Sequence, residues 1–288
     1  MSNDQKEIYT IGSKSYTAVA INTAAKAGEW IKLKLGAHAR LDLKSSSQDL
    51  VTEVDRGSEA LIRNLIKTHF PDHAFLGEEG VGSGPEASVK ALQEAIGEDY
   101  LWIVDPIDGT TNFVHGFPFF SVSIALAHRG EVIVGVVYDP IHDELFVAEK
   151  GKGAYLKGKP MRVSAEARLS DSLVATGFPA GTHTTLPVNM KGLQSIAPHV
   201  RNIRVVGSAA LHMAYVAAGR LSGFWEIGLN SWDLAAGALL VKEAGGEVTD
   251  TMGRSYSLPV RHVLATNGGI HRELQLQLAA ADATGYEA

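Results

Sequence analysis

The feature that most constrains this chain is residues 102–112, where a short apolar run ends in two aspartates. Residues 101–104 are apolar, which predicts a buried strand that delivers Asp105 at its end. Pro106 stiffens the exit, and Asp108 follows three residues after Asp105. Two carboxylates this close repel each other unless a cation lies between them. The segment therefore predicts a strand end at which two acids face one point.

The residue types around these acids favour a hard cation beside a phosphate. Carboxylate and carbonyl oxygens suit Mg²⁺, with ligand distances of about 2.0–2.1 Å. The chain has no cysteine, so zinc is the poorer expectation. Gly109, Thr110 and Thr111 offer close backbone approach, N–H groups and hydroxyls to an anion. A type I′ turn at Asp108-Gly109 with Thr110 as a helix cap fits the same residues, and both interpretations stay open.

Further acids stand where predicted elements begin or end. Glu78 follows a short predicted strand, Asp55 begins a predicted helix, and Asp233 begins another. Each has an ordinary alternative, because Glu78 with Glu79 could be a solvated loop pair, and the two aspartates could be helix N-caps. The whole set, together with the run from Asp105, favours one shared metal site.

Apolar periodicity outlines alternating helices and strands. Helices are predicted over 16–35, 55–70, 87–96, 188–196, 209–218 and 233–244, the last closed by two glycines. Strands are predicted over 73–77, 101–104, 173–177, 202–206 and 223–227, with an antiparallel meander over 119–127, 132–138, 145–149 and 153–157. This alternation predicts stacked helix and sheet layers.

Composition excludes several classes of function. With 288 residues, 45% of them hydrophobic, the chain can bury one large core or two packed halves. A formal charge of -6 argues against a broad nucleic-acid or lipid-binding face. The absence of cysteine excludes disulfides and a cysteine nucleophile. The polar N-terminus and the lack of a long apolar run predict a cytoplasmic protein that does not bind membranes.

Four motifs in order resemble the inositol monophosphatase family. They are the acidic segment at 102–111, the Trp-Asp segment at 232–237, and the shorter segments 49–55 and 77–79. The resemblance spans roughly residues 16–268. It implies an α/β (α+β) fold, a layered α/β/α/β/α sandwich of the type shared with fructose-1,6-bisphosphatases. It also implies a single domain over 1–288, with most metal ligands in an N-terminal half at about 10–165 and substrate contacts in a C-terminal half at about 166–275.

The resemblance implies Mg²⁺-dependent hydrolysis of a small phosphomonoester, with inositol 1-phosphate as the first expectation, by a metal-activated water. Two or three Mg²⁺ ions are implied in each active site. The first metal would be held by Glu78, Asp105 and the carbonyl of Ile107, and the second by Asp105, Asp108 and Asp233. A weaker third ion would lie near Glu78.

The resemblance also assigns catalytic and substrate-binding roles. Thr110, with Glu78, would orient and help deprotonate the attacking water, and Asp55 would pair with Thr110. The substrate-binding residues implied are Gly109, Thr110, Thr111, Gly207, Ser208, Ala209, Glu226 and Asp233. A carboxylate such as Glu226 can accept hydrogen bonds from a polyol. Ser208 fits a helix N-cap equally well, and Lys44 and Arg204 match basic positions of the family but fit exposed charges.

Shared metal motifs leave other functions open. The same chemistry could act on 3′-phosphoadenosine 5′-phosphate, NADP, fructose 1,6-bisphosphate or histidinol phosphate. A non-catalytic regulatory protein on the same fold is the remaining alternative. The expected partner is a small phosphorylated metabolite, with no nucleic acid and no membrane. A homodimer and inhibition by lithium are further expectations from the resemblance.

Overall fold

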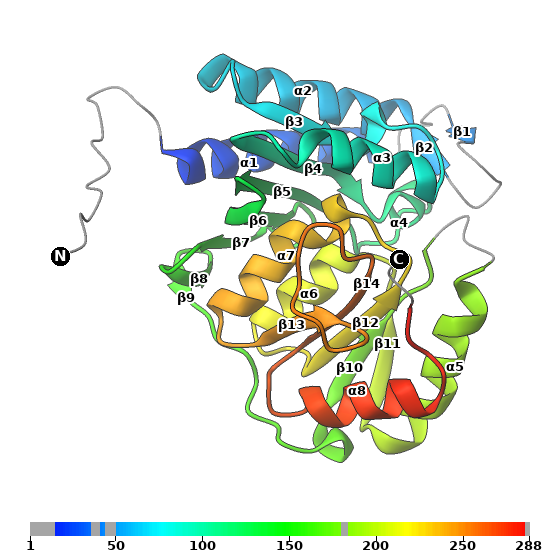
Figure 1. The fold of residues 1–288 in the computed structure, drawn as a ribbon. Coiled ribbons are helices and arrows are strands. Elements are labelled where there is room, and N and C mark those ends of the chain that lie inside the picture. The colour runs from blue at the N-terminus through cyan, green and yellow to red at the C-terminus, as the bar shows by residue number, and fades with distance from the viewer. Residues whose placement is uncertain (1–14, 36–40, 44–49, 180–183, 286–288) are drawn as a thin grey trace.

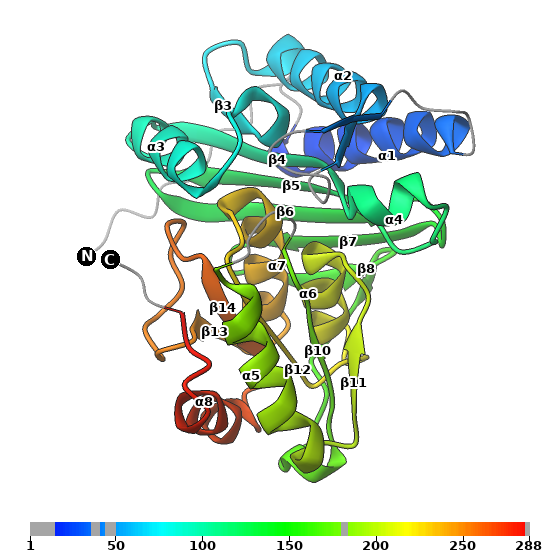
Figure 2. The same ribbon diagram turned by 90° about the vertical axis from the view of Figure 1, so that its right-hand side faces the viewer.

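The computed structural model describes residues 15–35, 41–43, 50–179 and 184–285, which stack in alternating layers of helix and sheet (Figures 1 and 2). The outer helices α1 (Tyr16–Lys34) and α2 (Glu53–His69) cover a seven-stranded sheet. Helices α6 (Ala209–Ala217) and α7 (Ser231–Glu243) separate it from a five-stranded sheet, and α5 (Leu186–Ile196) and α8 (His271–Ala280) cover the far side. The predicted α/β/α/β/α sandwich is confirmed.

The seven-stranded sheet has the order β3-β4-β5-β6-β7-β8-β9. Strand β3 pairs parallel with β4, and every later pair is antiparallel, so the predicted meander is confirmed. The strands are β3 (Ala74–Gly77), β4 (Tyr100–Asp108), β5 (Ser121–His128), β6 (Glu131–Asp139), β7 (Glu144–Glu149), β8 (Gly153–Leu156) and β9 (Lys159–Pro160).

The five-stranded sheet has the order β11-β10-β12-β14-β13. Strand β10 pairs parallel with both β11 and β12, whereas β14 is antiparallel to both β12 and β13. The strands are β10 (Leu173–Thr176), β11 (Asn202–Val205), β12 (Gly223–Ile227), β13 (Glu247–Asp250) and β14 (His262–Thr266).

Short elements connect these layers. The remaining helices are α3 (Pro85–Ala95), α4 (Thr110–Val114) and the 3₁₀ turns η1 (Glu78–Gly80), η2 (Leu169–Asp171) and η3 (Ala197–His199). Strands β1 (Leu41–Leu43) and β2 (Leu50–Thr52) form a separate antiparallel pair. Among the described helices, none is both long enough and apolar enough to cross a membrane.

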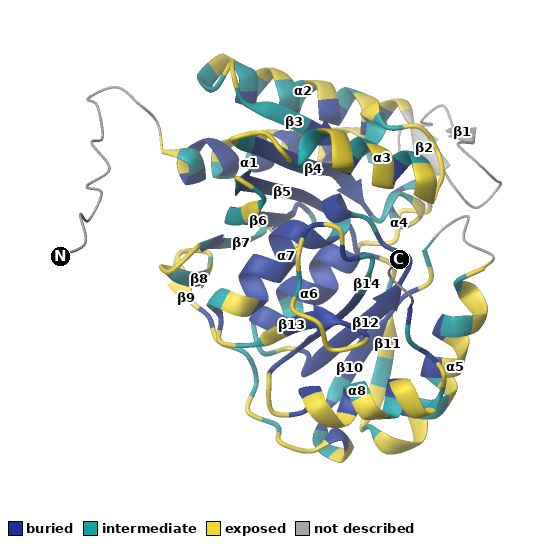
Figure 3. Cartoon of the chain, viewed as in Figure 1, coloured by how far each residue is buried: buried dark blue, intermediate teal, exposed yellow. Residues whose placement is uncertain are grey.

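The central helices α6 and α7 are rich in small residues, because they are packed between the two sheets at short distances. Figure 3 shows α6 and α7 buried along most of their length, as expected for helices that are apolar all round. A Cβ on Gly135 of β6 would lie 2.8 Å from the carbonyl oxygen of Ala236 in α7. One on Gly237 would lie 2.6 Å from Cβ of Met213 in α6. The layer therefore packs at distances that only glycine permits.

Two predicted boundaries at the acidic residues are wrong. Strand β4 does not stop at Asp105: its pairing with β5 shifts register there and resumes where Asp108 faces Ser121. Helix α2 begins at Glu53, so Asp55 is its third residue and not its N-cap. In both cases the regular backbone structure is longer than the apolar pattern: β4 continues beyond the pattern, and α2 begins before it.

Candidate active site

A cavity of about 370 Å³ opens where β4 ends, between the two sheets. It is lined by every site residue predicted above except Asp55: Glu78, Asp105, Ile107, Asp108, Gly109, Thr110, Thr111, Gly207, Ser208, Ala209, Glu226 and Asp233. These residues come from η1, the end of β4 and the start of α4 on one side, and from the α6, β12 and α7 segments on the other. The structure thus gathers residues far apart in the sequence into one cavity.

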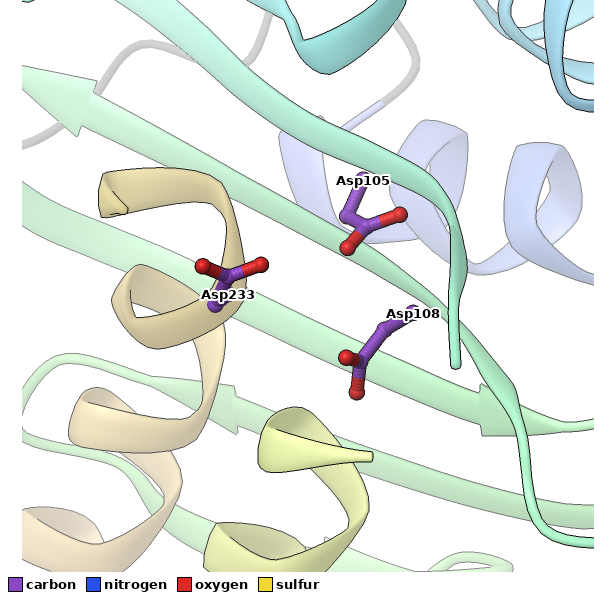
Figure 4. Close-up of side chains that lie close together, drawn as sticks. All are labelled: Asp105, Asp108 and Asp233. Atoms are coloured by element: carbon purple, nitrogen blue, oxygen red, sulfur yellow. The ribbon is translucent and has the colours of Figure 1, made fainter. Parts of the chain in front are cut away.

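Three aspartates that line this cavity lie close together (Figure 4). Asp105, Asp108 and Asp233 each offer a carboxylate oxygen, and the three oxygens lie within 4.8 Å of one another. The two β4 residues are buried, and Asp233 is half-buried in the first turn of α7. Asn230 is the N-cap of α7, and its N–H donates to Asp233 Oδ2 at 2.7 Å. Asp233 is therefore part of a capping box as well as of the cluster.

Burial makes this cluster costly to charge. It raises the pKa of the Asp105 carboxyl well above its usual value, and the charges of Glu78, Asp108 and Asp233 raise it further. Burial also raises the pKa of Asp233, again with the help of Asp108. The pKa of Asp108 is raised to about 6 by burial, against opposing hydrogen bonds from Ser208 and the α6 backbone.

The donor set fits a hard divalent cation. The clustered donors are all carboxylate oxygens, which suit Mg²⁺ better than softer metals. Among the described residues that line the cavity, Arg261 is the only basic side chain, and its guanidinium donates to the carbonyl of Leu229 at 2.8 Å. A bound cation would supply the countercharge that the acids need.

Glu78 lies in the same cavity but outside the group of three. It opens η1 directly after β3 and is half-buried. Its charge raises the pKa of Asp105, so the two carboxylates act on each other across the cavity. This arrangement favours the site interpretation over that of a solvated loop pair.

Thr110 links the cavity to the outer helix layer. Its hydroxyl lies 2.9 Å from Asp55 Oδ1, to which it can donate, and 3.1 Å from the carbonyl oxygen of Ile107. Asp55 is 1% exposed and does not itself line the cavity, but it contacts the lining residue Thr110. Gly109 has φ +102°, and a Cβ there would lie 3.0 Å from the Gly207 carbonyl. A glycine is therefore required at this turn.

The N-terminus of α6 bonds to Asp108. The Ser208 hydroxyl donates to Asp108 Oδ2, and the N–H of Ala210 donates to the same oxygen at 2.8 Å. The Ala209 N–H donates to Oδ1 at 3.3 Å. Ser208 also caps α6 by accepting from the Leu211 N–H. Ser208 and Ala209, predicted as substrate contacts, thus also hold an acid of the cluster.

Asn112 makes a second contact between the same two segments, and it was not among the site residues predicted from the sequence. Its side-chain nitrogen donates to the carbonyls of Val206 and Phe119, each at 2.6 Å. The turn 108–112 and the turn 206–210 therefore bond each other in both directions. The one available signal was the position of Asn112 at the end of the acidic segment.

Glu226, on β12, also lines the cavity. It is 5% exposed, and a Cβ on Gly177 would lie 2.2 Å from its carboxylate. Burial raises the pKa of Glu226 well above its usual value, with contributions from Asp233 and Asp108. Of the two basic residues noted in the sequence, Arg204 is exposed on β11, and Lys44 lies outside the described residues.

Comparison with known proteins gives a consistent family. The model of the inositol monophosphatase family matches residues 13–284. The chain is 43% identical over 258 residues to "Nus factor SuhB" of Pseudomonas aeruginosa, covering 86% of this chain and 90% of that protein. It is 43% identical over 259 residues to "Inositol monophosphatase 1" of Solanum lycopersicum, covering 88% and 91%. The solved structure of extragenic suppressor protein suhB from Bartonella henselae matches with a TM-score of 0.81 at 40% identity, covering 90% and 96%.

Proposed function

The chain belongs to the inositol monophosphatase family, which supports phosphatase activity, and from this premise we propose that it hydrolyses a small phosphomonoester in a Mg²⁺-dependent reaction. Inositol 1-phosphate is the first candidate substrate. The observation that carries the proposal is the cluster of Asp105, Asp108 and Asp233 beside the Thr110 turn.

The acids of the cavity would hold the metal. Asp105, Asp108 and Asp233, with Glu78 and the carbonyl of Ile107, are the proposed ligands of two or three ions. Bound Mg²⁺ supplies countercharge to the phosphate, a more acidic water and stabilisation of the leaving oxygen. Such help is needed, since this hydrolysis can require up to about 10²¹-fold acceleration, or about 28 kcal/mol. A general base alone supplies only about 10²–10⁴-fold.

The remaining residues position water and substrate. The Thr110 hydroxyl has Asp55 as acceptor for its proton, so its oxygen can accept a hydrogen bond from the attacking water. Glu78 is the proposed acceptor of the proton from that water. Gly109 and Thr111 are the proposed backbone contacts to the phosphate. Glu226, which also lines the cavity, is the proposed partner for hydroxyl groups of the alcohol.

Other substrates remain candidates because the clustered acids would act on the metal and the phosphate, which all the phosphomonoesters named above have in common. A regulatory role is the second candidate function, since relatives from Pseudomonas aeruginosa and Pasteurella multocida, 43% and 40% identical, are named "Nus factor SuhB". The complete set of acids favours catalysis. Cytoplasmic location, a homodimer and inhibition by lithium belong to the same proposal.

The experiment is phosphate release from a panel of phosphomonoesters, with Mg²⁺ and with a chelator. The panel contains inositol 1-phosphate, 3′-phosphoadenosine 5′-phosphate, NADP, fructose 1,6-bisphosphate and histidinol phosphate. We expect Mg²⁺-dependent turnover with inositol 1-phosphate preferred. Preference for another member changes the substrate and keeps the mechanism. No turnover of any member would reject the enzymatic proposal in favour of the regulatory one.

A further inference from the structure

One face of α2 contacts two separate segments of the candidate site, the Thr110 turn and the η1 turn. Asp55, Glu59 and Arg63 are spaced four residues apart, so they lie along one side of the helix. Asp55 accepts the Thr110 hydroxyl, as described above. Glu59, one turn further along, reaches the η1 turn that begins with Glu78. The two contacts tie separate catalytic segments to the same helix.

Both carboxylate oxygens of Glu59 have a partner. Oε2 accepts the backbone N–H of Glu79 at 2.7 Å, and Oε1 accepts from Arg63 Nη2 at 2.9 Å. The Glu59 side chain is only 7% exposed, whereas that of Arg63 is 39% exposed. The Arg63 guanidinium also lies 4.1 Å from the centre of the Phe75 ring on β3. Arg63 therefore fixes Glu59 against the strand that leads into Glu78.

The chain around Glu78 is shaped to admit this carboxylate. A Cβ on Gly77 would lie 2.3 Å from Glu59 Oε2, and one on Gly80 would lie 3.3 Å from Arg63 Nη2. Gly77 has φ −118°, which any residue adopts, so close approach is what requires glycine there. Glu59 thus touches the residues on both sides of Glu78. It fixes the backbone from which the Glu78 side chain projects.

We propose that Glu59, braced by Arg63, is a positioning residue that holds Glu78 in place for metal binding. The free-energy cost of removing two charges from water cancels much of the attraction between them, so such an ion pair contributes little net stability to the fold. Its clear consequence is geometric, because it fixes the turn between β3 and η1. Groups behind direct ligands tune metal affinity in this way. The inference rests on the proposed function, since it takes Glu78 as a ligand.

The test measures metal binding without turnover. Metal-stripped protein is titrated with Mn²⁺, a paramagnetic substitute for Mg²⁺, and free Mn²⁺ is followed by its electron paramagnetic resonance signal. Glu59→Met keeps the volume and removes the acceptor, and we expect about 10–100-fold weaker Mn²⁺ binding. Glu59→Gln keeps an acceptor for the Glu79 N–H, and we expect it to retain most of the affinity. A melting curve of each variant reports whether it is folded.

A matched control lies at the end of β13. Asp250 is 1% exposed, accepts the N–H groups of Met252 and Arg254, and pairs with the Arg254 side chain four residues later. Asp250→Ala should lower the melting temperature and leave Mn²⁺ binding unchanged, because Asp250 does not line the cavity.

The outcomes separate this inference from the proposed function. Wild-type protein that binds no Mn²⁺ would reject the metal site itself. If wild type binds Mn²⁺ and folded Glu59→Met binds it within about twofold, Glu59 does not position a ligand. Should Glu59→Met not fold, Arg63→Met removes only the brace, and we expect several-fold weaker binding. Unchanged affinity in folded Arg63→Met would then overturn the proposal.

Discussion

Each of the three clustered aspartates accepts a hydrogen bond from a backbone amide, and the three sources of these amides are β4, α6 and the N-cap of α7. Asp105 Oδ1 accepts the N–H of Ile107 at 2.9 Å, Asp108 accepts N–H groups of α6, and Asp233 accepts the N–H of Asn230. These bonds orient three like charges that would otherwise turn away from each other. The arrangement is costly without a cation, because burial and mutual repulsion raise the pKa values of Asp105 and Asp233. The three aspartates of the cluster are thus arranged around a positive charge that none of them supplies.

The first prediction concerns Asp105, which contributes to both proposed metal positions. Asp105→Asn should lower the rate of phosphate release by more than about 100-fold, because loss of a direct metal ligand should exceed the effect, about 10–100-fold, of losing a residue that only orients a ligand. The protein should stay folded, because a neutral amide relieves repulsion in the cluster. Asp139→Asn is the control: Asp139 is equally buried but accepts N–H groups of its own turn, at Ile141 and His142. Near-normal turnover of Asp105→Asn would contradict the site assignment.

The residues that line the candidate cavity could be predicted from the sequence, but Glu59 and Asn112, which hold the segments behind them, could not. Asp105 and Asp108 carry a local signal, since a strand and a turn precede them in the chain. Glu59 and Asn112 act on partners 20 and 94 residues away, at Glu79 and Val206. Helix spacing puts Glu59 on the same side as Asp55, but no pattern in one sequence says what that side faces.

At the scale of elements, the N-terminus of α6 joins the two halves of the cavity through its hydrogen bonds to Asp108. Ser208→Ala removes one of three hydrogen bonds to Asp108, so we expect about 10-fold weaker activation by Mg²⁺. Ser208→Thr keeps the hydroxyl and should keep activation. Initial rates over a range of Mg²⁺ concentrations measure the effect.

The control for Ser208 is another capping serine. Ser15 caps α1 by accepting the N–H of Ala18 at 3.1 Å, far along the chain from the cavity residues. Ser15→Ala should lower the free energy of unfolding by about 1 kcal/mol and leave activation by Mg²⁺ unchanged. If Ser208→Ala behaves in the same way as Ser15→Ala, then Ser208 only caps its helix.

Element boundaries and the last elements of the chain were harder to predict. Helix α7 and the meander are apolar runs bounded by glycines or turn residues, and the structure places them within a few residues of the prediction. Strands β13 and β14 and helix α8 were not predicted. The two strands are only four and five residues long and pair across the loop between them. Such short runs gain strand structure from neighbours in the sheet, which a single sequence does not reveal.

At the scale of the whole molecule, one layer of helices sets the distance between the sheets. Gly135→Ala would push a Cβ to 2.8 Å from the Ala236 carbonyl, so we expect a loss of about 1–3 kcal/mol in the free energy of unfolding. Because α7 also carries Asp233, Mg²⁺ activation should weaken as well. Gly97→Ala, which meets nothing within 4 Å, is the control in urea unfolding. Equal stabilities of the two variants would contradict this packing argument.

Buried His212, in the same helix layer, should make the stability of the protein depend on pH. It is 1% exposed on α6, and its ring lies 5.5 Å from that of Phe119 and 5.0 Å from that of Phe224. Among the described residues, neither ring nitrogen has a hydrogen-bond partner. Burial lowers the pKa of His212 from 6.5 to about 3, because charging the ring in this apolar layer is unfavourable. The folded protein therefore binds this proton less readily than the unfolded chain.

The sign of the pH effect follows from that difference. Above pH 6.5 the stability due to neutral His212 is present in full, and it is lost as pH falls from 6.5 towards 3. At pH 5 the loss should reach about 2 kcal/mol, at 1.36 kcal/mol per pH unit. Because buried and paired carboxylates also titrate, the measurement is the difference in urea unfolding between wild type and His212→Leu at pH 7.5 and pH 5. The leucine variant should gain about 2 kcal/mol on wild type over this interval, and a constant difference would mean that the folded protein protonates His212 as readily as the unfolded chain does.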